Sequence, residues 1–209
     1  MQLSGTVSLL DERLKASLNF FYNDLFNFIY RNNKAAPSEP IYQNAGYLRS
    51  AGGELEASWV DSWLHVRLMG TYQRAVSAQS YGTNGGSIFN VPSLSGALSI
   101  DVAPVMKWKE FLWLHGAVRF TGETQSPVSL AFKDSAGNPV LFDQPDRVIA
   151  AAAIVDLGVR VKNLPVRNVF VQATVYNLFN SFNEVGGSVV HPYPQTGRWF
   201  LATIGYTFE

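Results

Sequence analysis

Three histidines are the residues in this sequence best suited to acid–base or metal chemistry near neutral pH. His65 and His115 occupy polar positions in segments where polar and apolar residues alternate, and His191 lies in a loop-like stretch. Their spacing does not match a metal-ligand motif, and no Ser or Asp sits in a recognisable nucleophile motif. The sequence therefore predicts no catalytic residue, no metal site and no cofactor, and we do not expect an enzyme.

Glu54 and Glu56 are a second candidate, because paired carboxylates can act as general acid and base. Their i, i+2 spacing on a strand places both side chains on one face, so we interpret them as charges on a wet interior surface. Paired glycines could suggest phosphate cradles, but none of them follows a strand and opens a helix. We expect turn, bulge or loop roles for Gly52-Gly53, Gly85-Gly86 and Gly186-Gly187.

The composition limits the class of protein. Only 15% of the 209 residues are charged, whereas soluble domains usually contain about 25%. A formal net charge of 0 gives no electrostatic reason to bind nucleic acid, so we expect no such partner. Cysteine is absent, which excludes disulfides and thiolate metal sites. The longest apolar run, residues 148–155, is too short for a transmembrane helix.

Alternation of side-chain character is the main structural signal in the chain. Between Val169 and Tyr176, small apolar residues alternate with a second, more polar and aromatic set. Such a period of two indicates a strand whose faces meet different surroundings, and polar groups at every second position suit a strand between lipid and a wet interior. About nine such segments are predicted, at residues 3–9, 14–30, 53–60, 64–73, 95–102, 112–121, 155–162, 169–176 and 199–208.

The connections between these segments alternate in length. Short ones fall near residues 11–13, 61–62, 104–108 and 163–166, whereas long ones span about 31–42, 78–92, 123–147 and 181–197. Bacterial transmembrane barrels show this sorting, with short periplasmic turns and long external loops. The predicted fold class is therefore all-β, an antiparallel transmembrane β-barrel segment with up-and-down meander topology. Since single-chain bacterial barrels close with an even strand number, about nine strands predict an incomplete part of a larger barrel.

Aromatic residues fall into two groups in this scheme. Those near the short turns or the chain end are predicted to form a membrane girdle at headgroup level: Trp59, Trp63, Trp108, Phe111, Tyr206 and Phe208. Aromatics in the long loops are our candidates for solute contact, with packing of the loops on one another as the simpler interpretation: Tyr81, Phe89, Phe132, Phe142 and Tyr193. The same register puts Val159 toward lipid and Gly158 toward the interior, so Val159→Arg should impair membrane assembly more than Gly158→Arg.

Four segments carry a resemblance to a known family. The family's strand–turn–strand that ends in aromatic-Asn/Thr-Asp is similar to residues 7–26 (VSLLDERLKASLNFFYNDLF). Its Asn-x-Gly…Gly-x-Glu-Leu-Glu pattern is similar to residues 44–59 (NAGYLRSAGGELEASW). Residues 170–181 (FVQATVYNLFNS) resemble its penultimate strand, which ends in Asn-Leu-Phe-Asp/Asn. Residues 194–201 (PQTGRWFL), followed by Tyr206 and Phe208, resemble its Pro-x-x-Gly-Arg-x-Phe closing strand. Together they resemble the C-terminal part of a TonB-dependent receptor barrel, over essentially the whole chain.

The resemblance implies that residues 1–209 are the C-terminal portion of such a β-barrel in the bacterial cell outer membrane. Receptors of this family bind a scarce solute outside, usually an iron chelate such as a siderophore, a vitamin or a saccharide, and import it with energy. The implied partners are outer-membrane lipid, an N-terminal plug and further barrel strands, the TonB complex through an N-terminal box, and the barrel assembly machinery through the C-terminal strand. No export signal, plug or box is recognisable here, so we expect the natural N-terminus to lie beyond this sequence.

Other classes remain open at this stage. A small structural outer-membrane barrel or adhesin would need eight or ten strands and an export signal. An outer-membrane hydrolase would need a Ser–His pair on the lipid-facing side, whereas His65 and His115 are predicted to face the interior. A soluble β-sandwich has no reason to sort its loops by length, so it is the least favoured class.

Overall fold

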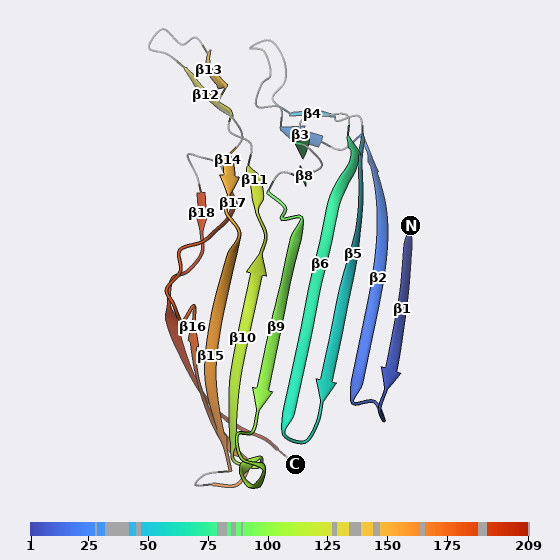
Figure 1. The fold of residues 1–209 in the computed structure, drawn as a ribbon. Helices are drawn as coiled ribbons and strands as arrows, with labels where there is room; N and C mark the ends of the chain where they lie inside the picture. The colour runs from blue at the N-terminus through green and yellow to red at the C-terminus, as the bar shows by residue number, and fades with distance from the viewer. Residues whose placement is uncertain are drawn as a thin grey trace.

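The computed structural model consists mainly of nine long strands in one antiparallel sheet (Figure 1). They are β1 (Gln2–Leu9), β2 (Leu14–Phe26), β5 (Tyr47–Val60), β6 (Leu64–Ala78), β9 (Leu94–Val102), β10 (Leu112–Thr121), β15 (Ala152–Lys162), β16 (Val169–Tyr176) and β19 (Trp199–Tyr206). Each pairs with the next long strand along the chain, which confirms the predicted up-and-down meander. The structure describes residues 1–27, 29–31, 42–44, 47–78, 83–84, 87–88, 90–126, 129–133, 139–143, 147–163, 166–187 and 192–208.

Some strands differ in extent from the prediction. β2 ends at Phe26 rather than at Tyr30. β5 begins at Tyr47 rather than at Gly53, because residues 47–52 continue the pairing with β2. Alternation did not predict this extension, since its polar and glycine residues do not alternate with apolar ones. The pairing of β5 with β6 also shifts between Arg49 and Ser50, where the sheet has a bulge or irregularity.

Short turns gather at one end of the sheet, drawn at the bottom of Figure 1. Their described residues are 10–13, 61–63, 103–111, 163 and 166–168. The first turn has left-handed backbone at Leu10, Asp11 and Glu12, with φ values of 55°, 53° and 65°. The third contains the 3-10 helix η1 (Met106–Trp108). Within the described ranges, no helix is long and apolar enough to cross a membrane.

The long connections lie at the opposite end and contain two-stranded sheets that the sequence did not predict (Figure 1). Their strands are short, and a period of two cannot be recognised over so few residues. The pairs are β3 (Ile29–Arg31) with β4 (Tyr42–Asn44), β7 (Thr83–Asn84) with β8 (Ser87–Ile88), β11 (Thr124–Ser126) with β14 (Arg147–Ile149), β12 (Ser129–Lys133) with β13 (Pro139–Asp143), and β17 (Glu184–Gly187) with β18 (Pro192–Pro194).

The register of the long strands sorts side chains into rows that cross the sheet. One row holds one apolar residue or glycine from each strand, namely Leu9, Leu14, Trp59, Val66, Ile100, Gly116, Leu157, Val175 and Phe200. The next row, on the other face, is mostly polar and consists of Ser8, Lys15, Ser58, Arg67, Ser99, Ala117 and Asp156. The sheet therefore has an apolar face and a polar face, as the alternation predicted.

Burial shows that the sheet is a single layer with almost no core of its own. Among the described side chains, the buried hydrophobic residues are only Ala75, Ala103, Ile149 and Ile154. The buried residues of the long strands all lie on the polar face, which indicates that this is the concave side: Ser50, Ala75, Ile154, Asp156 and Thr174. The apolar face carries large exposed side chains, among them Leu18, Phe20, Leu68, Leu157 and Ile204. An exposed apolar surface of this extent requires a nonpolar environment.

The sheet does not close on itself. β1 pairs only with β2 and β19 only with β16 among the strands that the structure describes, so each has an open edge. The fold is thus an unclosed part of a barrel, as predicted. In a bilayer, each unpaired backbone group of an open edge would cost several kcal/mol.

Two glycines have roles other than the predicted turn or bulge. Gly52 and Gly53 lie inside β5, and the aromatic ring of Phe21 packs over Gly52. A Cβ at Gly52 would collide with that ring and with the carbonyl oxygen of Tyr72. Gly52 is therefore needed for close packing of an aromatic ring on the polar face. Gly85 and Gly86 lie outside the described residues, and Gly187 lies where the pairing of β17 with β18 becomes irregular.

Candidate functional site on the polar face

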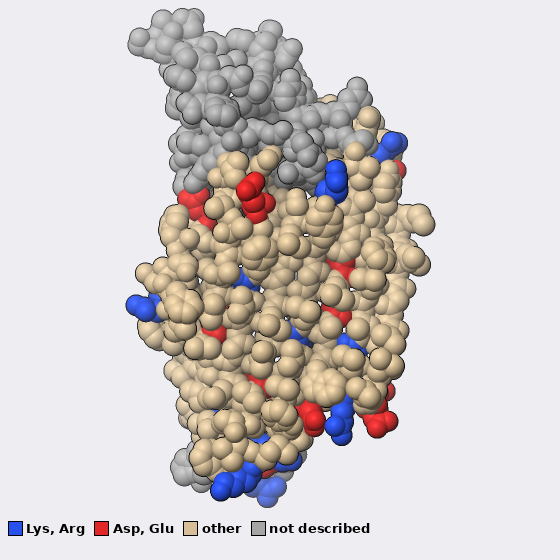
Figure 2. Space-filling model, in the orientation of Figure 1, with Lys and Arg blue, Asp and Glu red and all other residues tan. Residues whose placement is uncertain are grey.

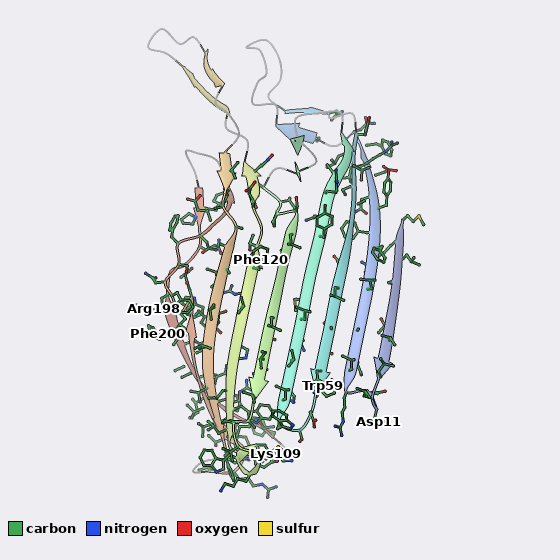
Figure 3. The ribbon with its side chains drawn as sticks, in the orientation of Figure 1. Asp11, Trp59, Lys109, Phe120, Arg198 and Phe200 are labelled. Atoms are coloured by element: carbon green, nitrogen blue, oxygen red, sulfur yellow. The ribbon has the colours of Figure 1, made fainter. Side chains whose placement is uncertain are left out.

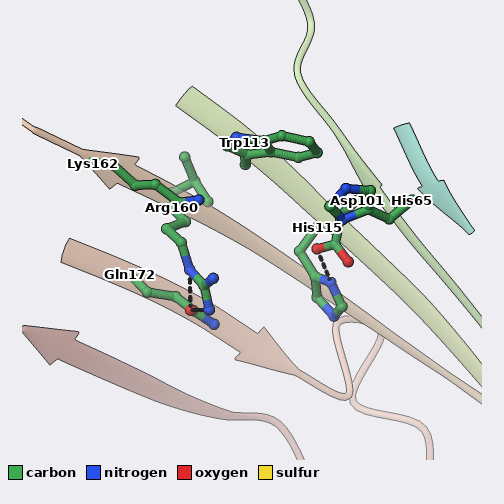
Figure 4. Close-up of a pocket in the computed structure, with 8 residues that line it drawn as sticks. His65, Asp101, Trp113, His115, Arg160, Lys162 and Gln172 are labelled. Atoms are coloured by element: carbon green, nitrogen blue, oxygen red, sulfur yellow. Dashed lines mark hydrogen bonds and ion pairs between the residues drawn. The ribbon is translucent and has the colours of Figure 1, made fainter. Parts of the chain in front are cut away.

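Two histidines and an aspartate form one row across the polar face near the short turns. His65 on β6 and His115 on β10 are both register partners of Asp101 on β9. His115 Nδ1 lies 2.8 Å from Asp101 Oδ1 (Figure 4). The His65 ring packs against Trp113, with 4.9 Å between ring centroids. The sequence placed both histidines on this face but did not reveal that Asp101 lies between them, because that requires the strand register.

β15 adds two cations beside this row. Arg160 donates hydrogen bonds from Nε and Nη2 to Gln172 Oε1, over 2.8 and 2.6 Å, and its guanidinium lies 5.5 Å from the centre of the Phe170 ring. Lys162 Nζ lies 5.6 Å from the centre of the Trp113 ring. Arg160, Lys162, Gln172 and Trp113 line a hollow of about 260 Å³ together with His65, Asp101 and His115 (Figure 4).

The side chains that line this hollow carry both charges and hydrogen-bonding groups. It contains cations, imidazoles, one carboxylate and an aromatic face, but no Ser, Thr or Cys nucleophile. No group of three or more His, Cys, Asp or Glu residues in the described ranges is placed to hold a metal ion. Such a surface is suited to polar or anionic groups of a polypeptide or solute.

A wider, about 500 Å³ hollow lies farther along the polar face. Glu54 and Glu56 both line it, in agreement with their predicted common face. Glu54 Oε2 accepts a 2.8 Å hydrogen bond from Asn19 Nδ2. Arg119 on the same wall donates to both carboxylate oxygens of Asp156, each over 3.2 Å. Glu54, Glu56 and Arg119 thus line one open hollow of the polar face, and the two glutamates do not form an isolated carboxylate pair.

Asp156 also fixes the chain where β16 ends. Its side chain is buried, and Oδ1 accepts a 2.9 Å hydrogen bond from the backbone N–H of Asn177. Asn177 has φ 51°, and its side chain binds backbone groups of Ser181 over 2.8 and 2.9 Å. Asn180 Oδ1 accepts the N–H of Arg198, which ties this turn to the start of β19. The Asn-Leu-Phe-Asn motif noticed in the sequence thus stabilises a tight turn.

Comparison with known proteins identifies the family. Residues 2–178 match the family described as "TonB dependent receptor-like, beta-barrel". The chain belongs to this family. Members of this family are receptors and transporters of the bacterial outer membrane, so the predicted location holds. No curated protein sequence matches the chain.

Solved structures of TonB-dependent receptors share the fold. The ferric-catecholate import receptor Fiu of E. coli K12, in its closed form, is 20% identical with a TM-score of 0.71, over 99% of this chain and 27% of that chain. The siderophore receptor PiuA of Acinetobacter baumannii is 15% identical, TM-score 0.70, over 98% and 28%. The ferripyoverdine receptor of Pseudomonas aeruginosa, bound to ferripyoverdine, is 16% identical, TM-score 0.69, over 97% and 26%. At these identities the likeness concerns the fold alone, and this chain spans about a quarter of each receptor.

The predicted girdle aromatics of this TonB-dependent receptor barrel all lie at the short-turn end or the chain end. Figure 3 shows Trp59 at the lower end of β5, and Lys109, in the turn between β9 and β10, at the same end of the sheet. The Tyr206 and Phe208 rings meet edge to face, with 4.9 Å between centroids. Charged groups gather at the same end (Figure 2), as expected where strands leave the membrane. Contact of these aromatics with lipid headgroups stays a prediction.

Of the predicted solute-contacting aromatics, Tyr193 is the one whose side chain the structure describes, and contact with a solute stays a prediction for all five. Tyr193 on β18 is 61% exposed. Phe132 and Phe142 lie on the paired strands β12 and β13, but their side chains are outside the described part. Tyr81, Phe89 and His191 lie outside the described residues altogether.

Proposed function

We propose that this chain is the C-terminal portion of the β-barrel of an outer-membrane receptor that imports a scarce solute with energy from the TonB complex. The observation that carries the proposal is the division of one single-layer sheet into an apolar and a polar face, neither of which is covered by another layer within the part of the chain that the structure describes. A lipid-facing barrel with a wet, filled interior accounts for both faces. Membership in the TonB-dependent receptor family supports the same conclusion.

For the solute, we propose a ferric siderophore. The similar structures include a ferric-catecholate import receptor, a siderophore receptor and a ferripyoverdine receptor, which supports this class above vitamins and saccharides. β18, which carries the exposed Tyr193, lies toward the end that would face outward. We propose that it contacts solute together with Tyr81, Phe89, Phe132 and Phe142.

The rest of the receptor would supply the parts that energised import requires. We propose an N-terminal plug that occupies the space facing the polar side of the sheet, and further strands that pair with the open edges of β1 and β19. A TonB box preceding the plug would contact the TonB complex. We also propose that the barrel assembly machinery recognises β19, because it presents an unpaired strand edge.

Uptake by intact cells tests this proposal. The source bacterium, with and without the complete gene that contains these codons, would receive ⁵⁵Fe bound to a catecholate, a hydroxamate or citrate. We expect the deletion strain to lose uptake of at least one chelate. Because import requires energy, the parent strain should lose uptake of the same chelate when it is treated with an uncoupler. Tyr193→Ala should weaken binding of that chelate roughly fivefold or more, whereas Tyr206→Ala, far from the loops, should not. Unchanged uptake of every chelate would favour a structural barrel or adhesin.

A further inference from the structure

The apolar face of the sheet carries three charged side chains among the described residues of the nine long strands. They are Asp24 on β2, Arg49 on β5 and Arg74 on β6, and we call them the arginine patch. Asp24 and Arg49 are register partners, and Arg74 pairs with Ala51, two residues from Arg49 along β5. Such diagonal neighbours on adjacent strands lie about 7–8 Å apart. The three charges of the apolar face therefore form one cluster.

The arginine patch lies toward the end of the strands opposite the short turns, which is the external end of a bacterial barrel (Figure 1). Asp24 precedes the end of β2 by two residues, and Arg49 follows the start of β5 by two. From the patch to the short turns, the described part of the apolar face carries no further charge. The patch therefore marks the external boundary of the apolar band.

Tyrosines surround the arginine patch. Tyr22 and Tyr72 belong to the same face, each two residues from a patch residue along its strand, and both are exposed. The Tyr47 ring centre lies 5.2 Å from the guanidinium of Arg49. Rings with a polar tip are typical of the level where hydrocarbon meets lipid headgroups, because their bodies are apolar and their hydroxyls bind polar groups. Their positions place the patch at this level.

The arginine patch has donors for an anion. Asp24 accepts a 2.9 Å hydrogen bond from Arg49 Nε, whereas no described side chain accepts one from the two Nη groups of Arg49. No described carboxylate lies within ion-pair distance of Arg74, which is exposed. Two arginines against one aspartate leave an excess of positive charge. Since a guanidinium fork matches two oxygens of a phosphate, the chemistry of the patch fits a phosphate group.

We propose that the arginine patch binds the phosphate of a lipid headgroup in the external leaflet. A lipid is the expected source, because the patch lies on the face that meets the bilayer and directly borders its apolar band. Arg74 and the Nη groups of Arg49 would hold the phosphate oxygens, and the acyl chains would lie along exposed apolar side chains such as Phe20 and Leu55. The inference goes beyond the proposed import of a solute, since it assigns a lipid ligand to the outer wall of the barrel.

Native mass spectrometry of the complete receptor tests the proposal. Protein stripped of lipid in detergent receives phosphatidylglycerol, whose headgroup is anionic, or phosphatidylcholine, whose choline neutralises the phosphate. Arg74→Gln and Arg49→Gln/Arg74→Gln remove one or both cations, and Arg49→Lys/Arg74→Lys keeps both charges. Arg67→Gln is the matched control, because it removes a cation from the polar face of the same strand. Folded migration on an unheated gel is required of every protein, so that a misfolded barrel is not scored.

We expect the parent to bind phosphatidylglycerol more tightly than phosphatidylcholine, and the double Gln variant to bind phosphatidylglycerol roughly tenfold more weakly than the parent. Arg74→Gln should lie between these two, and the double Lys variant and Arg67→Gln should stay close to the parent.

Three results would overturn the lipid site. One is equal binding of phosphatidylglycerol by all variants, and another is an equal loss in Arg67→Gln, which would indicate a general effect of charge. The third is complete displacement of the lipid by inorganic phosphate, which would indicate a site for soluble anions. Uptake of iron chelates is scored separately in cells. Loss of lipid binding with unchanged uptake therefore distinguishes this inference from the proposed function.

Discussion

Two neighbouring residues on β6 provide a matched test of which face of the sheet meets lipid. Leu68 belongs to the apolar face, with Ala57 and Leu98 as register partners. Met69 belongs to the polar face, beside Glu56. Their exposed fractions are nearly equal, 41% and 43%. Replacing each by Arg therefore introduces the same charge at the same depth and with similar space, and only the surroundings differ.

The expected difference follows from the cost of a charge in lipid. An arginine on the lipid face near the bilayer midplane costs about 2–4 kcal/mol. Met69→Arg meets water and the Glu56 carboxylate, and an exposed ion pair changes the free energy of unfolding by less than about 1 kcal/mol. Leu68→Arg should therefore lower the ratio of folded to unfolded barrel by roughly 30- to 1,000-fold relative to Met69→Arg.

Folding of the complete receptor into phospholipid vesicles across a urea series measures this difference. The folded fraction is scored by migration on an unheated gel, since an intact barrel resists the detergent until it is boiled. We expect Leu68→Arg to shift the transition to lower urea and Met69→Arg to stay close to the parent. Equal behaviour of the two variants, or the reverse order, would refute the assignment of the faces.

Two further predictions concern stability. Asp156→Ala removes the acceptor of both a guanidinium and a backbone N–H, so we expect the free energy of unfolding in the same urea assay to fall by about 2–4 kcal/mol. Its control, Asp24→Ala, breaks an exposed ion pair and should lower the free energy of unfolding by less than about 1 kcal/mol. Gly52→Ala forces a methyl group against an aromatic ring and should lower the free energy of unfolding by about 1–3 kcal/mol. Its control, Gly5→Ala, places the added Cβ with no atom within 4 Å, so it should leave the free energy of unfolding nearly unchanged. Equal effects within either pair would contradict the packing described here.

The strands and faces were predictable because their physical signal is local. Alternation in segments such as residues 169–176 depends only on the sequence itself. The sorting of connections by length predicted which end of the strands faces the periplasm. The extension of β5 to Tyr47 was not predictable from alternation, since pairing with β2 rather than hydrophobic pattern maintains it. The hairpins of the long connections were missed because each strand is too short to show a period.

The site depends on register, which a single sequence does not reveal. His65 and His115 are fifty positions apart in the chain, yet both pair with Asp101 once β6, β9 and β10 are aligned. The pairing of Arg160 with Gln172 has the same origin. Register also affects the mutation pair chosen from the sequence: a Cβ at Gly158 would lie 2.9 Å from Thr174 Oγ1. Gly158→Arg would therefore test packing as well as environment, and Met69 is the better control.

Spin-label scanning along β6 tests the central claim most directly, namely that this sheet is a wall between lipid and a polar interior. Single cysteines at positions 64–73 of the complete receptor in a bilayer would carry the label, and its collisions with oxygen and with a water-soluble nickel chelate would be compared. We expect a period of two, with oxygen favoured at Leu64, Val66, Leu68 and Tyr72 and the nickel chelate favoured at His65, Arg67 and Thr71. Uniform access, or the opposite phase, would contradict it.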